Sequence, residues 1–105
     1  MSVITLTAAD NKKLVNLNRG DEVVIRLLES PTTGYRWALG QFDAAILTSL
    51  SRDYAPAEAV GGSGEAAFAF KAEKPGSTQI TLKLWREWEG ERSVTERFEI
   101  KITVG

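Results

Sequence analysis

The chain has 105 residues, of which 43% are hydrophobic and 26% charged, which predicts one globular domain spanning residues 1–105. Lys and Arg total 13 and Asp and Glu total 14, so a net charge of −1 argues against nucleic acid or an anionic membrane as the main partner. The chain contains no Cys and no His, which excludes disulfides, thiolate zinc sites, a cysteine nucleophile and every histidine-based triad.

Apolar and polar residues alternate with a period of two along the chain, which predicts a series of short β-strands. Residues 46–51 form the weakest candidate, and a short helical turn is the alternative there. The apolar runs are too short for a membrane-spanning helix. In chain order, the expected strands are 3–6, 14–17, 22–28, 35–39, 46–51, 66–70, 80–84 and 98–104.

This pattern predicts an all-β fold. Clean alternation is typical of antiparallel sheets that are exposed to water on one face. Seven to eight short strands in about 100 residues indicate an immunoglobulin-like antiparallel β-sandwich. Trp37 lies where such domains often bury a tryptophan. A small eight-stranded barrel is the alternative.

The topology of a sandwich also predicts where the loops lie. Successive strands run mostly in opposite directions, so the loops that follow every second strand gather at one end. The strands that end near Leu28, Arg52 and Trp85 are followed by segments 30–34, 53–64 and 86–92. We therefore expect these three loops at one end, and ordinary tight turns at 19–20 and 75–76 at the other.

The first loop reads Ser30-Pro31-Thr32-Thr33-Gly34. Pro31 fixes its own φ angle and favours an extended Ser30, and the two threonines are β-branched and stiff. Gly34 permits a positive φ where the chain enters the next strand. The sequence predicts a rigid loop that displays two hydroxyl groups and suits a binding role. An ordinary turn is the alternative.

The second loop contains Gly61-Gly62-Ser63-Gly64. It precedes a strand rather than a helix, so it lacks the helix N-terminus that phosphate-binding loops use. Its exposed backbone suits pairing with an extended partner segment. A flexible loop without a binding role is the alternative.

The third loop places Trp88 beside Arg86 in a polar segment. An exposed tryptophan next to an arginine is typical of an interface hot spot, and the alternative is a lid over the end of the sandwich. The loop also contains three glutamates, Glu87, Glu89 and Glu91. They could form a cation site or a pair of catalytic carboxylates, but a solvated hairpin tip is the stronger interpretation.

Together, the three loops resemble those of the chagasin family of cysteine-peptidase inhibitors. That family carries an Asn-Pro-Thr-Thr-Gly-Tyr, a Gly-x-Gly-Gly and an Arg-Pro-Trp motif, in that order. Here they read Ser30-Pro31-Thr32-Thr33-Gly34-Tyr35, Gly61-Gly62-Ser63-Gly64 and Arg86-Glu87-Trp88. Each motif departs from the pattern at one position, occupied here by Ser30, Ser63 and Glu87. The resemblance extends over nearly the whole chain.

The resemblance implies reversible, tight inhibition of papain-like cysteine peptidases by three loops that wedge into the active-site cleft. It places Thr32 over the catalytic cysteine, segment 60–64 along the substrate channel, and Trp88 on aromatic residues beyond the catalytic centre. The implied peptidase-binding residues are Pro31, Thr32, Thr33, Gly34, Val60, Gly61, Gly62, Gly64, Arg86 and Trp88.

We therefore expect a monomeric protein that is not an enzyme, needs no cofactor or metal, and binds a papain-like cysteine peptidase rather than nucleic acid or a membrane. The alternative is an immunoglobulin-like binding or adhesion module for another protein, without peptidase inhibition. The N-terminal residues alternate and lack an apolar signal segment, which predicts a cytoplasmic location. A signal peptide removed before residue 1 would instead predict a periplasmic or secreted protein.

Overall fold

The computed structural model describes residues 2–29, 33–55 and 64–105, for which it gives an all-β fold. Short 3-10 helices η1 (Ala8–Asp10), η3 (Glu87–Glu89) and η4 (Glu91–Ser93) interrupt the connections. In this part of the chain no helix is long and apolar enough to cross a membrane. The strands are β1 (Val3–Leu6), β2 (Leu14–Leu17), β3 (Glu22–Glu29), β4 (Arg36–Leu39), β5 (Leu47–Ala55), β6 (Gly64–Ala72), β7 (Gly76–Trp85) and β8 (Glu96–Val104).

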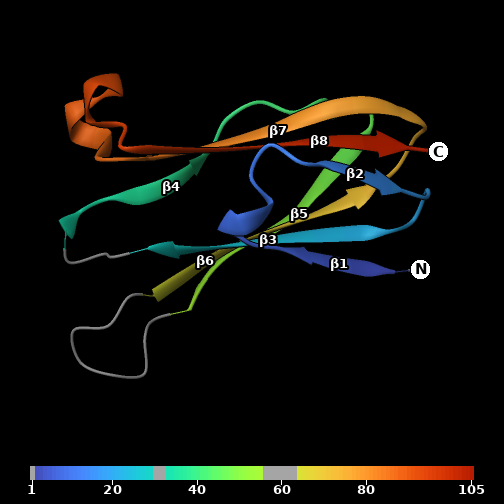
Figure 1. Cartoon of the computed structure of the whole chain (residues 1–105), viewed down its shortest axis with the longest axis horizontal. Coiled ribbons are helices and arrows are strands. Elements are labelled where there is room, and N and C mark those ends of the chain that lie inside the picture. Colours follow the sequence, from blue (N-terminus) through green and yellow to red (C-terminus); the bar gives the residue numbers. More distant parts are fainter. Residues whose placement is uncertain (1, 30–32, 56–63) are drawn as a thin grey trace.

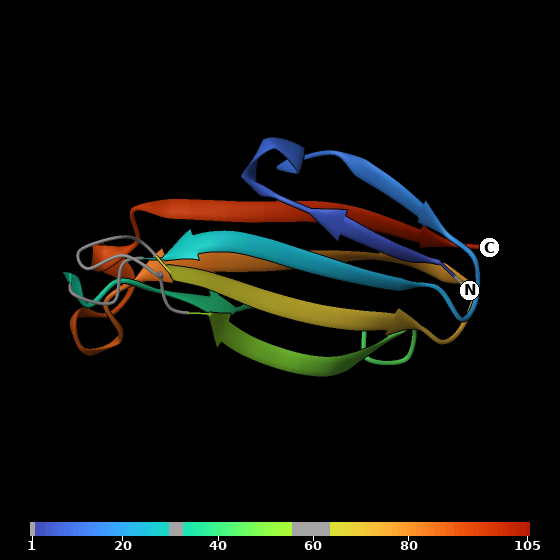
Figure 2. The same ribbon diagram turned by 90° about the horizontal axis from the view of Figure 1, so that it is seen from below.

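The strands form two four-stranded sheets, with the orders β1-β3-β6-β5 and β2-β8-β7-β4 (Figure 1). The predicted immunoglobulin-like sandwich is confirmed, and the barrel alternative is wrong because the two sheets stay separate. β1 and β2 border one long side of the sandwich, and β4 and β5 border the other (Figure 2).

Two pairings differ from the expected antiparallel arrangement. β1 runs parallel to β3, and β2 runs parallel to β8. All other strand pairs described are antiparallel. Hydrophobic alternation says which face of a strand is buried, but it carries no information on the direction of the neighbouring strand.

The core lies between the two sheets and consists of the inward-facing residues of each strand. β6 alternates strictly between buried and half-buried positions along its whole length. Trp37 is only 4% exposed, as predicted. The other large core side chains are Leu6, Leu17, Val23, Ile25, Leu27, Leu47, Phe68, Phe70, Ile80, Leu82, Phe98, Ile100, Ile102 and Val104.

Of the weak candidate at 46–51, residues 47–51 lie in β5, so the helical-turn alternative is wrong for them, whereas Ile46 closes a turn in which its N–H donates to the carbonyl oxygen of Asp43. The register of β5 against β6 shifts between Ser49 and Ser51, and Leu50 at this bulge is 46% exposed. A β-bulge inserts an extra residue and reverses the side-chain parity beyond it. The bulge explains why alternation in the sequence is weak here.

β3, β5 and β7 all finish at the same end of the sandwich (Figure 1). In one sheet Glu29 lies opposite Gly64 and Ala55 opposite Glu65, and in the other Arg36 lies opposite Trp85. The connections 30–35, 56–63 and 86–95 therefore all start at this end, which we call the loop end. The two chain ends lie at the opposite end.

Candidate functional site

At the loop end, Arg86 joins the first loop to the third. Its Nε–H donates a hydrogen bond to the carbonyl oxygen of Thr33 at 3.0 Å. Its guanidinium carbon lies 4.5 Å from the centre of the Tyr35 ring, within the range of a cation–π contact. Its Nη1 lies 3.3 Å from Oε1 of Glu89. The Arg86 side chain thus fixes two loops that are far apart in the sequence.

Trp88 forms a second contact between the same loops. Gly34 has φ +80°, as expected, and a Cβ placed on it would lie 2.4 Å from Cη2 of Trp88. The indole therefore lies directly against the backbone of Gly34. Trp88 is nevertheless 72% exposed, so the interpretation as a lid over the core is wrong. Its exposed face is available to a partner.

Ser93 holds the third loop in shape. It is buried, and its Oγ accepts the backbone N–H of Arg86 at 3.0 Å. The same hydroxyl has one proton to donate, and two carbonyl oxygens lie within its reach, that of Gly90 at 2.6 Å and that of Arg86 at 2.9 Å. These contacts close the segment that carries Trp88. The sequence gives no signal for this role, because a serine in a polar loop is ordinarily exposed.

Two of the three glutamates of this loop are used in ion pairs. Glu89 pairs with Arg86, whereas Glu91 contacts Lys83 and lies 3.6 Å from Arg97. The hydrogen bond from Lys83, together with the charges of Lys83 and Arg97, lowers the pKa of Glu91 below its ordinary value. Across residues 2–29, 33–55 and 64–105, no cluster of three acidic side chains is arranged to hold a metal ion.

The predicted site residues are only partly within the described chain. Pro31, Thr32, Val60, Gly61 and Gly62 lie outside the described residues. The structure brings Thr33, Gly34, Arg86 and Trp88 together. Gly64 is buried as the first residue of β6, at the base of the second loop. Contact of any of these residues with a peptidase stays a prediction.

Sequence reasoning missed Glu29, which is buried at the base of the first loop. Its Oε1 accepts the backbone N–H of Trp37 at 2.6 Å. Nearby, the indole N–H of Trp37 donates to the carbonyl oxygen of Leu28 at 2.9 Å. The sequence did contain a signal for this residue. Val23, Ile25 and Leu27 face inward, and continuing this alternation by two residues places Glu29 in the interior as well.

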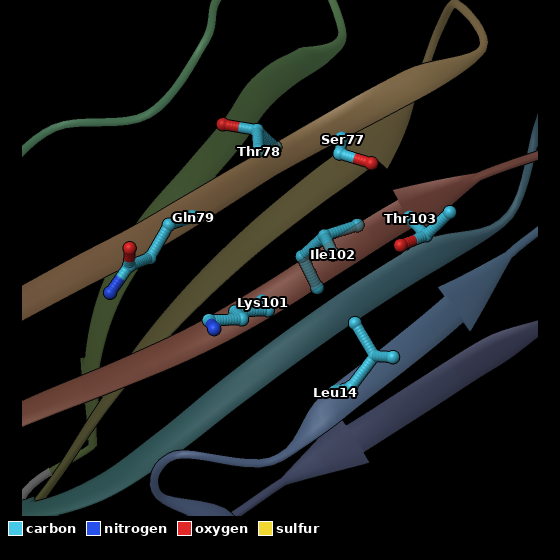
Figure 3. A pocket seen from close by; sticks show the side chains of 7 residues that line it. All are labelled: Leu14, Ser77, Thr78, Gln79, Lys101, Ile102 and Thr103. Carbon is cyan, nitrogen blue, oxygen red and sulfur yellow. The ribbon is translucent and has the colours of Figure 1, made fainter.

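Two hollows in the surface differ in their position. A hollow of about 390 Å³ lies at the loop end and is lined by Gly34, Arg36, Glu87 and Trp88. A larger one, of about 480 Å³, lies over β2, β7 and β8 (Figure 3). It is lined by residues near the start of β7, such as Ser77, whereas Trp88 follows the end of that strand. Lys101 is the only ionisable residue that lines the larger hollow, so this hollow holds no acid–base pair among the described residues.

The fold and this pair of joined loops define a class: an immunoglobulin-like sandwich that presents two joined loops and an exposed tryptophan at one end. The model of the chagasin family of peptidase inhibitors, I42, matches residues 16–102. The chain belongs to this family, and the resemblance seen in its motifs is confirmed. It is a cysteine-peptidase inhibitor and not an enzyme.

Solved structures with the same fold include the cysteine protease inhibitor EhICP2 from Entamoeba histolytica, with a TM-score of 0.90 and 21% identity over 100% of this chain and 97% of that one. Amebosin has a TM-score of 0.81 and 23% identity over 97% of both chains. PbICP-C, solved in complex with falcipain-2, has a TM-score of 0.68 and 18% identity over 100% of both chains. A comparison with curated proteins gives no significant match.

Proposed function

We propose that the loop end of this protein inserts into the active-site cleft of a papain-like cysteine peptidase and blocks it reversibly. The observation that carries this proposal is the pair of contacts between the first and third loops. Arg86 is hydrogen-bonded to Thr33, and Trp88 packs on Gly34 while remaining 72% exposed. An aromatic side chain that is both held in place and exposed suits a binding hot spot.

Preorganisation explains why such contacts favour inhibition. A loop that must become ordered on binding loses conformational entropy, and this loss lowers the affinity. Here the backbone of Thr33 is fixed by Arg86, which is itself held through its N–H by the buried Ser93. The peptidase therefore meets loops that are already ordered at these residues. The similar protein PbICP-C, solved with falcipain-2, supports a peptidase as the partner.

Inhibition of papain on a small fluorogenic substrate tests the proposal. We expect the rate to fall with added protein and to recover on dilution, because the chain has no cysteine that could form a disulfide with the catalytic thiol of the enzyme. Trypsin, which has a serine nucleophile, serves as the control and is expected to remain fully active. An unchanged papain rate at micromolar protein, repeated with other papain-like enzymes, would favour the alternative of a binding module for another protein.

A further inference from the structure

A carboxylate ends the inward-facing series of β3. Val23, Ile25 and Leu27 are buried core residues, and Glu29, the next residue with the same parity, is only 7% exposed. A buried carboxylate is unfavourable unless it is hydrogen-bonded or paired, and an apolar residue would fill the same space without that cost. The presence of an acid at this position indicates that its charge or its acceptor oxygens have a use.

The groups that need these acceptor oxygens lie on the free edge of β4, which is the last strand of its sheet. The N–H of Gly40 donates to the carbonyl oxygen of Thr81 on β7 at 2.7 Å. In an antiparallel ladder the hydrogen-bonded pairs alternate, so the backbone groups of Trp37 point away from β7. Without other partners, these two groups would remain unpaired beside a buried side chain.

Two charged side chains from the opposite sheet supply the partners. Oε1 of Glu29 on β3 accepts the N–H of Trp37 at 2.6 Å. Nη2 of Arg52 on β5 donates to the carbonyl oxygen of Trp37 at 2.9 Å, and its guanidinium carbon lies 5.5 Å from the centre of the Phe68 ring. Hydrogen bonds with an ionised partner are stronger than neutral ones. We call this arrangement the Glu29–Trp37–Arg52 clamp.

The clamp lies where the first loop leaves and re-enters the sandwich. Glu29 is the last residue of β3, and Trp37 is the second residue of β4, so the clamp fixes the distance between the end of β3 and the start of β4. The contacts of Thr33 and Gly34 with Arg86 and Trp88 depend on that distance. Arg52 lies on the strand that leads into the second loop. The clamp thus connects the base of the first loop to β5, three residues before that strand ends.

We propose that Glu29, with Arg52, is a positioning residue of the inhibitory surface: it contacts no peptidase and sets the positions of Thr33 and Gly34. This inference rests on the proposed function. A buried carboxylate that only stabilises the fold would not affect inhibition, and the chain contains such a carboxylate as a matched control. Asp21 is a buried carboxylate at the opposite end, and it accepts the backbone N–H groups of Ser2 at 3.0 Å and Asn18 at 2.9 Å.

The test compares Glu29→Ala, Glu29→Gln and Asp21→Ala in the full chain, by their inhibition constants against papain and their melting temperatures. We expect Glu29→Ala to raise the inhibition constant about 10-fold or more, because it removes a charge-assisted hydrogen bond at the loop base. Glu29→Gln keeps an acceptor oxygen and is expected to restore most of the affinity. Asp21→Ala is expected to lower the melting temperature and leave inhibition unchanged.

A second measurement separates this proposal from the proposed function. NMR amide exchange at Trp37 is expected to accelerate in Glu29→Ala, and the heteronuclear NOE of Thr33 and Gly34 is expected to fall, with neither change in Asp21→Ala. If the wild-type chain inhibits no papain-like peptidase, the proposed function fails, and these NMR changes still decide whether Glu29 positions the loop.

Three results would overturn the proposal: unchanged inhibition by Glu29→Ala, an equal loss in Glu29→Ala and Asp21→Ala, or an unaltered NOE at Thr33 and Gly34. If Glu29→Ala does not fold, Arg52→Ala replaces it, since it removes the other half of the clamp. We then expect the inhibition constant to rise about threefold or more, a smaller loss because the bond from Arg52 to Trp37 is only partly buried, whereas the bond to Glu29 is buried. An unchanged constant for a folded Arg52→Ala would also overturn the proposal.

Discussion

The six-membered ring of Trp88 lies against the α-carbon of Gly34, so closely that a methyl group on Gly34 would meet the ring at 2.4 Å. The two residues belong to different loops, and these loops are joined again by the hydrogen bond from Arg86 to Thr33. The first and third loops therefore act as one surface at these residues, and a change in either is expected to affect the other.

Trp88→Ala is expected to weaken inhibition of a papain-like peptidase by about 30-fold, because a central interface tryptophan contributes about 2 kcal/mol or more. Its side chain is 72% exposed, so the melting temperature is expected to change little. Leu28→Ala is the control, since Leu28 is 70% exposed on the outer face of β3. A large fall in the melting temperature of Trp88→Ala would show that the ring is structural.

Gly34→Ala is expected to lower both stability and inhibition, because a Cβ meets the indole and φ +80° is unfavourable for alanine by about 1–2 kcal/mol. Gly90→Ala separates these causes: Gly90 has φ +74° with nothing within 4 Å of its Cβ position. Urea unfolding and inhibition assays are expected to show the larger loss for Gly34→Ala. Equal losses would mean that the contact with Trp88 is unimportant.

Arg86→Lys is expected to weaken inhibition by about 1–2 kcal/mol, or roughly 5- to 30-fold, although the charge is retained. Lysine lacks the planar group that donates to Thr33, stacks on Tyr35 and pairs with Glu89. Arg92→Lys, an exposed position of the same loop, is the control and is expected to have no effect. Full activity of Arg86→Lys would indicate that only the positive charge matters.

Glu87→Pro, which restores the family motif, is expected to tighten inhibition by about 0.5–1.5 kcal/mol through slower dissociation. Glu87 is the first residue of η3, where an N–H has no partner within the helix and proline is favoured. Arg86 before it has the extended conformation that precedes proline, with φ −97° and ψ 112°. Dissociation rates for the two proteins test this. A faster rate would mean that Glu87 itself contacts the peptidase.

The stability of the protein is expected to fall in acid partly through Asp21. Backbone hydrogen bonds from Asn18 and then Ser2 lower the pKa of this carboxyl below its ordinary value of 3.8. A lowered folded-state pKa stabilises the fold above 3.8, and this stabilisation is lost as the pH falls through the folded-state value. Urea unfolding between about pH 2 and 7 is expected to show a smaller acid loss for Asp21→Asn than for the wild type. Identical pH profiles of stability for Asp21→Asn and the wild type would contradict this role of Asp21.

The amino-acid sequence determines the sandwich because the alternation of apolar and polar residues identifies the buried face of almost every strand. Ile80 and Leu82 on β7, like Phe98 and Ile100 on β8, are buried as the alternation predicts. The order and spacing of the three loop motifs can also be read directly from the sequence, and they were sufficient to identify the family. The positive φ of Gly34 was also predictable from the sequence, since it depends only on this residue and its neighbours in the chain.

Only the tertiary structure decides which polar groups meet. The Nε–H of Arg86, a predicted peptidase-binding residue, donates to Thr33, which is 53 positions away in the sequence. Glu29 and Arg52 likewise find their common partner, Trp37, across the two sheets. Alternation specifies whether a side chain points inward or outward. It cannot specify a hydrogen-bond partner, because that choice depends on which segments the folded sheets bring within about 3 Å of each other.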